Sequence, residues 1–258
     1  MRITFGHLVC LFGCFCGLAG CGIFGEDKLG GMTVRDAFKD PLVAEMVEAA
    51  SSGRLSVVDA KIKAGANVNY MGTDGITPLL WVIPMNHHAH DFSGVRRLLE
   101  AGADPNYEDP RTQASAVYLA AGGDIPSLLE LVLKFRGNPN LVGPRNETPL
   151  MTAVMQFRGE NIDLLLKYGA DVNAHDKFGA SAPNTASDLG RFDIVARFLD
   201  KGFSYNLEKL AKAVQSRPVP PNSDAERWKD KVLKMLEQRG VNIPPPPPKV
   251  STGPHVAP

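Results

Sequence analysis

The chain has 258 residues, enough for one or two ordinary domains, and its 28 basic residues balance its 28 acidic ones. Proteins that bind nucleic acid need a basic surface, so this balance argues against nucleic acid as the partner. All four cysteines lie within the first 21 residues. The remainder of the chain therefore contains neither a disulfide nor a free thiol.

Residues 1–20 are predicted to form a secretory signal peptide. After Arg2, the run from Ile3 to Gly20 is apolar, with no charge other than what His7 holds, and it ends in small residues. A short basic start, an apolar core and small residues at the end are typical of such signals. At eighteen residues the run is also at the lower limit for crossing a bilayer, so a retained membrane anchor is the alternative.

The signal ends in Leu18-Ala19-Gly20-Cys21, which resembles the lipobox of bacterial lipoproteins. The resemblance implies cleavage before Cys21, a covalent lipid such as palmitate on its sulfur, and acylation of the new amino terminus. Several acyl chains hold a protein stably at a membrane. Because Gly22 follows, where retention in the inner membrane would favour Asp, the resemblance further implies an outer-membrane protein that faces the periplasm.

Two segments without a core-forming pattern flank the rest of the chain. Residues 21–40 contain several glycines and are predicted to form a flexible tether from the lipidated cysteine. Residues 244–258 begin with five consecutive prolines and are predicted to form an extended, disordered tail. The folded domain is therefore expected within residues 41–243.

Residues 41–243 contain an internal repeat. A phrase of the form Gly-Ala-Asp-x-Asn occurs at residues 102–106 and 169–173, and Gly-Ala-Asn-x-Asn occurs at 65–69. The interval from the Thr or Ser that opens a unit to the Asn that closes it is 25 residues in three units, namely Ser115–Asn140, Thr148–Asn173 and Ser181–Asn206. Eight residues separate most closing Asn residues from the next opening residue, so the period is 33.

This pattern resembles the ankyrin repeat, with a Thr-Pro-Leu turn, two helices and a Gly-Ala-Asp-x-Asn loop in each unit. The best copy runs from Asn146 to Asp176. The resemblance implies an all-α repeat solenoid of about five repeats plus a carboxy-terminal cap over residues 207–243. The first unit, residues 41–69, lacks the Thr-Pro-Leu turn and suits an amino-terminal cap, while the second contains a four-residue insertion.

Elementary physical chemistry agrees with that assignment in the best copy. Thr148 can cap the first helix, and Pro149 suits its first position. Ile162 and Leu165 belong to an apolar stripe on the second helix, so Leu165 is expected in the core. Gly169 is expected to end that helix in a left-handed conformation. A single repeat cannot bury both of its faces, so the units must stack.

One cluster in the inserted loop has residue types that bind metals. His87, His88 and His90, with Asp91 beside them, could chelate zinc or copper through neutral imidazoles. The alternative is a polar loop in solvent, since no fourth ligand is evident from the spacing. No nucleophile elbow, zinc-protease motif or phosphate-binding loop occurs, so we expect no enzyme and no cofactor apart from the lipid on Cys21.

The ankyrin resemblance also implies a surface for a protein partner. In that family partners meet the concave face, which consists of hairpin tips and faces of the first helices. The corresponding positions of this chain are Thr73, Asp74, Ile76, Met85, Arg111, Thr112, Arg145, Glu147, Met155, Gln156, Lys177, Phe178, Asp188 and Leu189. Several are apolar and mixed with cations, which is typical of an interface. The alternative is that isolated exposed apolar residues are common.

These inferences predict a monomeric protein-binding module that lipid at Cys21 holds in the periplasm. Lipoproteins with ankyrin repeats resemble immunity proteins that neutralise toxic phospholipase effectors of type VI secretion, and this is the most concrete role that we expect. The alternative is an accessory protein for metal handling or oxidative stress that uses the loop of His87, His88 and His90.

Overall fold

The computed structural model describes residues 28–29, 31–85 and 91–243. The predicted signal peptide, Cys21, the histidines at positions 87, 88 and 90, and the proline-rich tail lie outside this description. The chain divides into two compact units, one ending at Ala182 and one beginning at Pro183, and each is described by itself.

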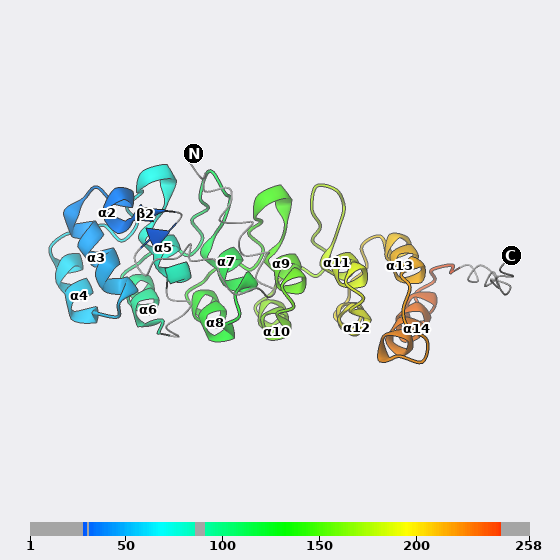
Figure 1. Cartoon of the computed structure of the whole chain (residues 1–258). Helices are drawn as coiled ribbons and strands as arrows, with labels where there is room; N and C mark the ends of the chain where they lie inside the picture. The colour runs from blue at the N-terminus through cyan, green and yellow to red at the C-terminus, as the bar shows by residue number, and fades with distance from the viewer. Residues whose placement is uncertain (1–27, 30, 86–90, 244–258) are drawn as a thin grey trace, which may run out of the picture. The chain divides into compact units, whose positions relative to one another are not determined.

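The first unit contains a short antiparallel strand pair followed by helices that come in pairs (Figure 1). The first helices of successive pairs contact one another, as α3 contacts α5, α5 contacts α7 and α7 contacts α9. Its elements are β1 (Lys28–Leu29), β2 (Met32–Thr33), α2 (Val34–Ala37), α3 (Pro41–Ser51), α4 (Leu55–Lys63), η1 (Thr73–Gly75), α5 (Pro78–Met85), α6 (Ser93–Glu100), α7 (Ala116–Gly122), α8 (Pro126–Lys134), η2 (Pro144–Asn146), α9 (Pro149–Met155) and α10 (Gly159–Lys167).

The second unit continues the same alternation of helices. Its elements are α11 (Ala182–Asp188), α12 (Phe192–Asp200), α13 (Leu207–Ser216) and α14 (Asp224–Glu237), and α14 contacts both α12 and α13. Helix pairs with short connections throughout the described residues confirm the predicted all-α repeat solenoid.

The core of each pair forms from the residues that the repeat pattern predicts. Leu165 and Ile162 are fully buried on α10, and Trp81 is fully buried on α5. Small residues recur at one position of the first helices, namely Ala49, Ala120, Ala153 and Ala186, and each is at most 2% exposed. A methyl group at that position lets the two helices of a pair approach closely.

Helix starts and ends follow the predicted chemistry as well. The hydroxyl of Thr148 accepts a hydrogen bond of 3.1 Å from the amide of Met151, and Ser115 caps α7 in the same way. The backbone of Gly169 has a φ of 86°, so the predicted left-handed end of α10 is confirmed. An L-residue with a side chain would be strained at such a φ.

The hydrogen bonds of the closing Asn explain why this residue recurs at the end of the units. The side-chain amide of Asn69 donates to the carbonyl of Gly102 at 2.9 Å, and its oxygen accepts from the amide of Asp104 at 2.8 Å. Asn106 bonds in the same way to the next unit, and so does Asn140. The three side chains form an asparagine ladder that ties each loop to the following one.

The prediction of a flexible tether over residues 21–40 is wrong for its second half. Leu29, Ala37 and Phe38 are each at most 1% exposed, because the chain turns back through β1 and β2 and packs its apolar residues on the first helix pair. The ring of Phe38 meets that of Trp81 edge-on, with 5.8 Å between centroids.

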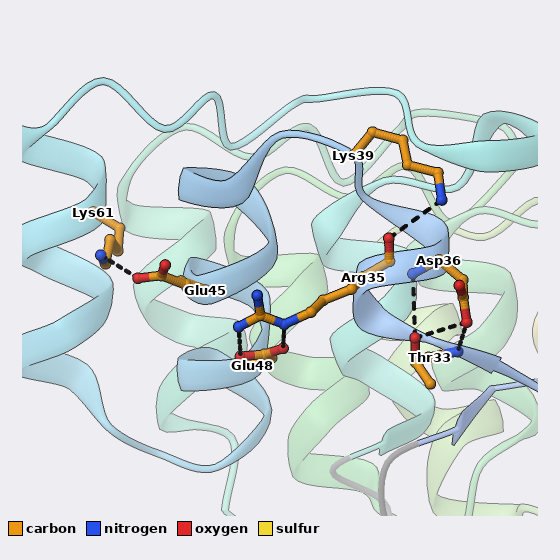
Figure 2. A network of polar contacts seen from close by, with 7 residues as sticks. All are labelled: Thr33, Arg35, Asp36, Lys39, Glu45, Glu48 and Lys61. Carbon is orange, nitrogen blue, oxygen red and sulfur yellow. Dashed lines mark hydrogen bonds and ion pairs between the residues drawn. The ribbon is translucent and has the colours of Figure 1, made fainter.

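Polar contacts hold this amino-terminal segment in place (Figure 2). Thr33 and Asp36 form a reciprocal capping box at the start of α2. Both Nε and Nη2 of Arg35 reach the Glu48 carboxylate on α3, at 3.1 and 3.5 Å. On the neighbouring helix, Lys61 pairs with Glu45 and lowers the pKa of that carboxyl through a hydrogen bond. The segment therefore covers the first helix pair.

Candidate protein-binding surface

Tight hairpin-like turns project between the helix pairs of the first unit. In two of them the turn closes through a backbone hydrogen bond, from Gly72 to Ile76 at 2.8 Å and from Gly143 to Glu147 at 2.7 Å. Asp74 and Asn146 adopt left-handed conformations at the tips, with φ of 60° and 63°. Asp and Asn tolerate this conformation better than other side chains, so the sequence suits these turns.

Side chains connect neighbouring tips. The guanidinium of Arg111 lies 3.1 Å from the carboxylate of Asp74, one unit earlier in the chain. The hydroxyl of Tyr107 donates to the carbonyl of Gly75 at 2.7 Å. Burial raises the pKa of that hydroxyl, with the charge of Asp109 as the second cause. These contacts fix the spacing between the first two tips.

The structure places the predicted partner-binding residues in three groups. The exposed residues of the first unit are Thr73, Asp74, Arg111, Lys177 and Phe178. Those of the second unit are Asp188 and Leu189. Met85, Glu147, Met155 and Gln156 are half-buried. Ile76 and Thr112 are buried, and the side chain of Arg145 lies outside the described residues.

Burial excludes Ile76 and Thr112 from a partner surface, so these two predictions are wrong. Ile76 is 2% exposed, because it precedes the capping residue Thr77 in extended backbone and turns its side chain into the core. Thr112 is 6% exposed, and its amide donates to the buried carboxylate of Asp109 at 2.7 Å. Asp109 organises this loop, and the stretch Asp109-Pro110-Arg111 was the signal for such a turn.

Phe178 is the most prominent apolar side chain at a tip. It is 70% exposed, and the ammonium of Lys177 lies 5.1 Å from its ring centroid. Its backbone is held, since Asp176 Oδ1 accepts from the amides of Phe178 and Ala180 at 2.8 Å each. A large ring on an ordered turn loses little conformational entropy when a partner covers it, which favours a role in binding.

The sequence reasoning missed a second exposed phenylalanine. Phe157 lies in the middle of the turn between α9 and α10, is 55% exposed and has a φ of 57°. Gly53 and Gly190 occupy the same place in the α3–α4 and α11–α12 turns, with φ of 68° and 72°. An L-residue in this conformation costs about 1–2 kcal/mol. Comparing Gln156-Phe157-Arg158 with Ser52-Gly53-Arg54 would have revealed the exception.

An open surface hollow of about 200 Å³ lies beside that turn. Its lining consists of Gly123, Asp124, Pro126, Arg158, Gly159, Glu160 and Asn161. The Asn161 side chain is 1% exposed, and its Nδ2 donates to the carbonyls of Ala121 and Gly123 at 2.9 Å each. Arg158 Nε adds a bond of 3.3 Å to the carbonyl of Gly122. The turn after α7 is thus bonded to the turn after α9.

The histidines proposed as metal ligands lie outside the described residues, and so does Cys21. Within residues 28–29, 31–85 and 91–243, no group of three or more His, Cys, Asp or Glu side chains is arranged to hold a metal ion. The same residues include no helix that is long and apolar enough to cross a bilayer.

Stacked helix pairs with projecting tips define a repeat protein. A family model for the ankyrin repeat matches residues 74–110, and a model for three ankyrin repeats matches residues 116–209. Together they cover about half of the chain, which therefore belongs to the ankyrin-repeat family.

The chain spans less than two thirds of the length of each of three relatives that it resembles. A Danio rerio protein named for palmitoyltransferase activity, ZDHHC13, is 31% identical over 62% of this chain and 24% of its own length. The Fowlpox virus ankyrin repeat protein FPV031 is 27% identical over 68% of this chain and 57% of its own length. The Lachancea kluyveri palmitoyltransferase AKR1 is 28% identical, and the match spans 21% of that protein.

Membership of the family supports one functional statement at a coarse level. Ankyrin repeats generally mediate protein–protein interaction and are typically not enzymes. The chain is accordingly a protein-binding module. The similarity to the palmitoyltransferases runs through ankyrin repeats and covers a minor part of those proteins.

Proposed function

We propose that the exposed tips of the first unit bind a protein partner, with Phe178 as the main apolar contact. The observation that carries this proposal is the 70% exposure of Phe178 on a turn whose backbone is held by Asp176. The exposed charges of Asp74 and Arg111 supply the polar surroundings that interfaces usually have. Met85 and Met155, both half-buried at the ends of first helices, add adaptable apolar surface.

The cellular role that we propose is that of an immunity protein in the bacterial envelope. Lipid on Cys21 would hold the chain at the outer membrane, facing the periplasm, where a toxic effector such as a phospholipase acts. A tight binder needs no catalysis to neutralise such a toxin. The lipobox-like Leu18-Ala19-Gly20-Cys21 and the ankyrin repeats support this role.

The anchoring part is tested by mass spectrometry of the protein from bacterial membranes. We expect a chain that begins at Cys21 and carries lipid, and a Cys21→Ser variant that carries none. Detection of Met1, or of an unmodified cysteine, in the wild-type protein would reject anchoring. Recovery in the inner-membrane fraction alone would contradict the outer-membrane location and leave lipidation intact.

The binding part is tested with Phe178→Ala. The first step is to establish whether a neighbouring gene encodes a lipase-like effector. That effector is then the probe, and its Kd for the purified protein is measured by calorimetry. Absence of such a gene would count against the immunity role. Truncating a central aromatic contact costs about 2 kcal/mol, so we expect roughly thirty-fold weaker binding and loss of protection in cells. The matched control is Lys63→Ala, which changes an exposed side chain on α4 and should leave the Kd unchanged.

Two outcomes would redirect the proposal. Unchanged affinity and protection in the Phe178→Ala variant would contradict the tip surface. Loss of protection in a variant that replaces His87 and His88, with recovery on addition of zinc or copper, would favour the metal-handling alternative.

A further inference from the structure

Asp74 is the one aspartate or asparagine in the 258-residue sequence that is followed by glycine. An Asp-Gly pair can isomerise spontaneously, because glycine has no side chain to shield its amide nitrogen or to restrict its backbone. The pair lies in η1, at the tip between α4 and α5, and the Asp74 side chain is 47% exposed. The carboxyl group, the glycine amide and solvent therefore come together at this tip.

The isomerisation needs no reactant other than water. The amide nitrogen of Gly75 attacks Cγ of Asp74 and forms a nitrogen–carbon bond, while the hydroxyl of the protonated carboxyl group leaves with the amide proton as one water molecule. Water then opens the cyclic imide at one of its two carbonyls. Opening at Cγ restores aspartate. Opening at the main-chain carbonyl gives isoaspartate, whose backbone runs through Cβ. Mass and oxidation state are unchanged overall.

The folded tip keeps the two reacting atoms apart. The ψ of Asp74 is 17°, which turns the Gly75 nitrogen away from the Asp74 side chain, so the ring can close only after a large rotation about this bond. The Gly75 amide donates to the carbonyl of Gly72 at 3.0 Å, and the Gly75 carbonyl accepts from the hydroxyl of Tyr107 at 2.7 Å. The peptide between Asp74 and Gly75 cannot rotate until both hydrogen bonds break.

Arg111 restrains the carboxyl group in addition. Its Nη1 lies 3.1 Å from Oδ2 of Asp74 and holds the carboxylate toward the following tip. We propose that Asp74 is a modification site, which converts to isoaspartate, and that Arg111 and Tyr107 restrain this conversion in the folded protein. The product carries one more carbon in the main chain at the tip and so changes the surface that Thr73 and Asp74 present. The inference goes beyond partner binding and does not depend on it.

The rate of conversion tests the proposal. Purified full-length protein is aged in mildly acidic buffer, and the tryptic peptide that begins at Ala64 is analysed by chromatography and electron-transfer fragmentation, which distinguish isoaspartate from aspartate. Loss of an exposed ion pair in Arg111→Ala should raise the rate by up to about fivefold. Tyr107→Phe keeps the ring and removes one hydrogen bond, so the rate should rise about two- to tenfold. The matched control is Arg96→Ala, which removes an exposed arginine on α6 and should leave the rate unchanged.

The chain unfolded in guanidinium gives the unrestrained rate, which should be the fastest. Absence of isoaspartate at Asp74 in the unfolded chain would overturn the modification site. A folded wild-type rate equal to the unfolded rate would overturn the restraint by the tip. Equal rates in the wild type, Arg111→Ala and Tyr107→Phe would overturn the roles of the two side chains. Melting temperatures show whether either variant has lost its fold, in which case the other variant decides.

Discussion

At the scale of single residues, Leu165 shows what a repeat core contributes to stability. It is fully buried on α10, in the apolar stripe that the repeat pattern predicts. Truncating a packed leucine removes apolar contacts and leaves a cavity, so Leu165→Ala should lower the free energy of unfolding by roughly 2–5 kcal/mol. Denaturant titration of the purified protein measures this change. A loss within about half a kcal/mol, as surface substitutions give, would contradict the burial.

Residue-scale reasoning from the sequence worked where the repeat dictates a conformation. Gly169 was predicted to be left-handed and is, because the helix must end before the closing loop. The prediction that Ile76 faces a partner was wrong, because its place in the ankyrin pattern does not show which way its side chain points. The residue precedes the capping Thr77 in extended backbone, and its side chain is buried. Phe157 was missed because it lies outside the phrases that define the repeat, and only a comparison with Gly53 and Gly190 in this chain's own turns shows the exception.

At the scale of elements, the amino-terminal segment behaves as an integral part of the first unit. Phe38 is 1% exposed and packs against the rings of Trp81 and Tyr70, with centroids 5.8 and 6.4 Å away. Phe38→Ala should therefore destabilise the protein by about 3–5 kcal/mol. Thermal or denaturant unfolding of the variant measures the loss.

The matched control for that substitution is Arg35→Ala on α2. Its side chain is 66% exposed, so solvent screens its ion pair with Glu48 and the expected cost is at most about 1 kcal/mol. An equal loss in both variants would show that the segment is held by its surface charges. Unchanged stability in both variants would support the original prediction that the segment is a flexible tether.

Element-scale prediction failed here for a physical reason. Residues 28–38 lie outside every copy of the repeat, so the period gave no information about them, and the glycines at positions 30 and 31 suggested flexibility. The apolar residues Val34, Ala37 and Phe38, at the i, i+3 and i+4 spacing of one helix face, were the available sign of burial. One of those glycines serves the turn between β1 and β2, where Gly31 has a φ of 86°.

At the scale of the whole molecule, the 33-residue period was sufficient to predict the helix pairs, their caps and the stacked core. Every unit must pack against its neighbours, so the units share one helix-pair structure. A unit whose motif is incomplete can therefore be assigned from the clearer units beside it. The candidate surface was less predictable. Surface side chains are free to vary between copies, and the structure was needed to separate exposed tip residues from buried ones such as Thr112.

The asparagine ladder has a consequence for how such a chain can change length. In this ladder each asparagine side chain donates to a carbonyl in the following unit. The acceptor lies 33 residues after Asn69, 30 residues after Asn106 and 29 residues after Asn140. The same pair of bonds thus forms across intervening segments of unequal length, and the longest of them contains the inserted loop of the second unit. A difference of four residues between two closing asparagines therefore leaves the hydrogen bonds of both in place, so we expect the loops inside a unit to change in length without loss of the contacts that join it to its neighbours.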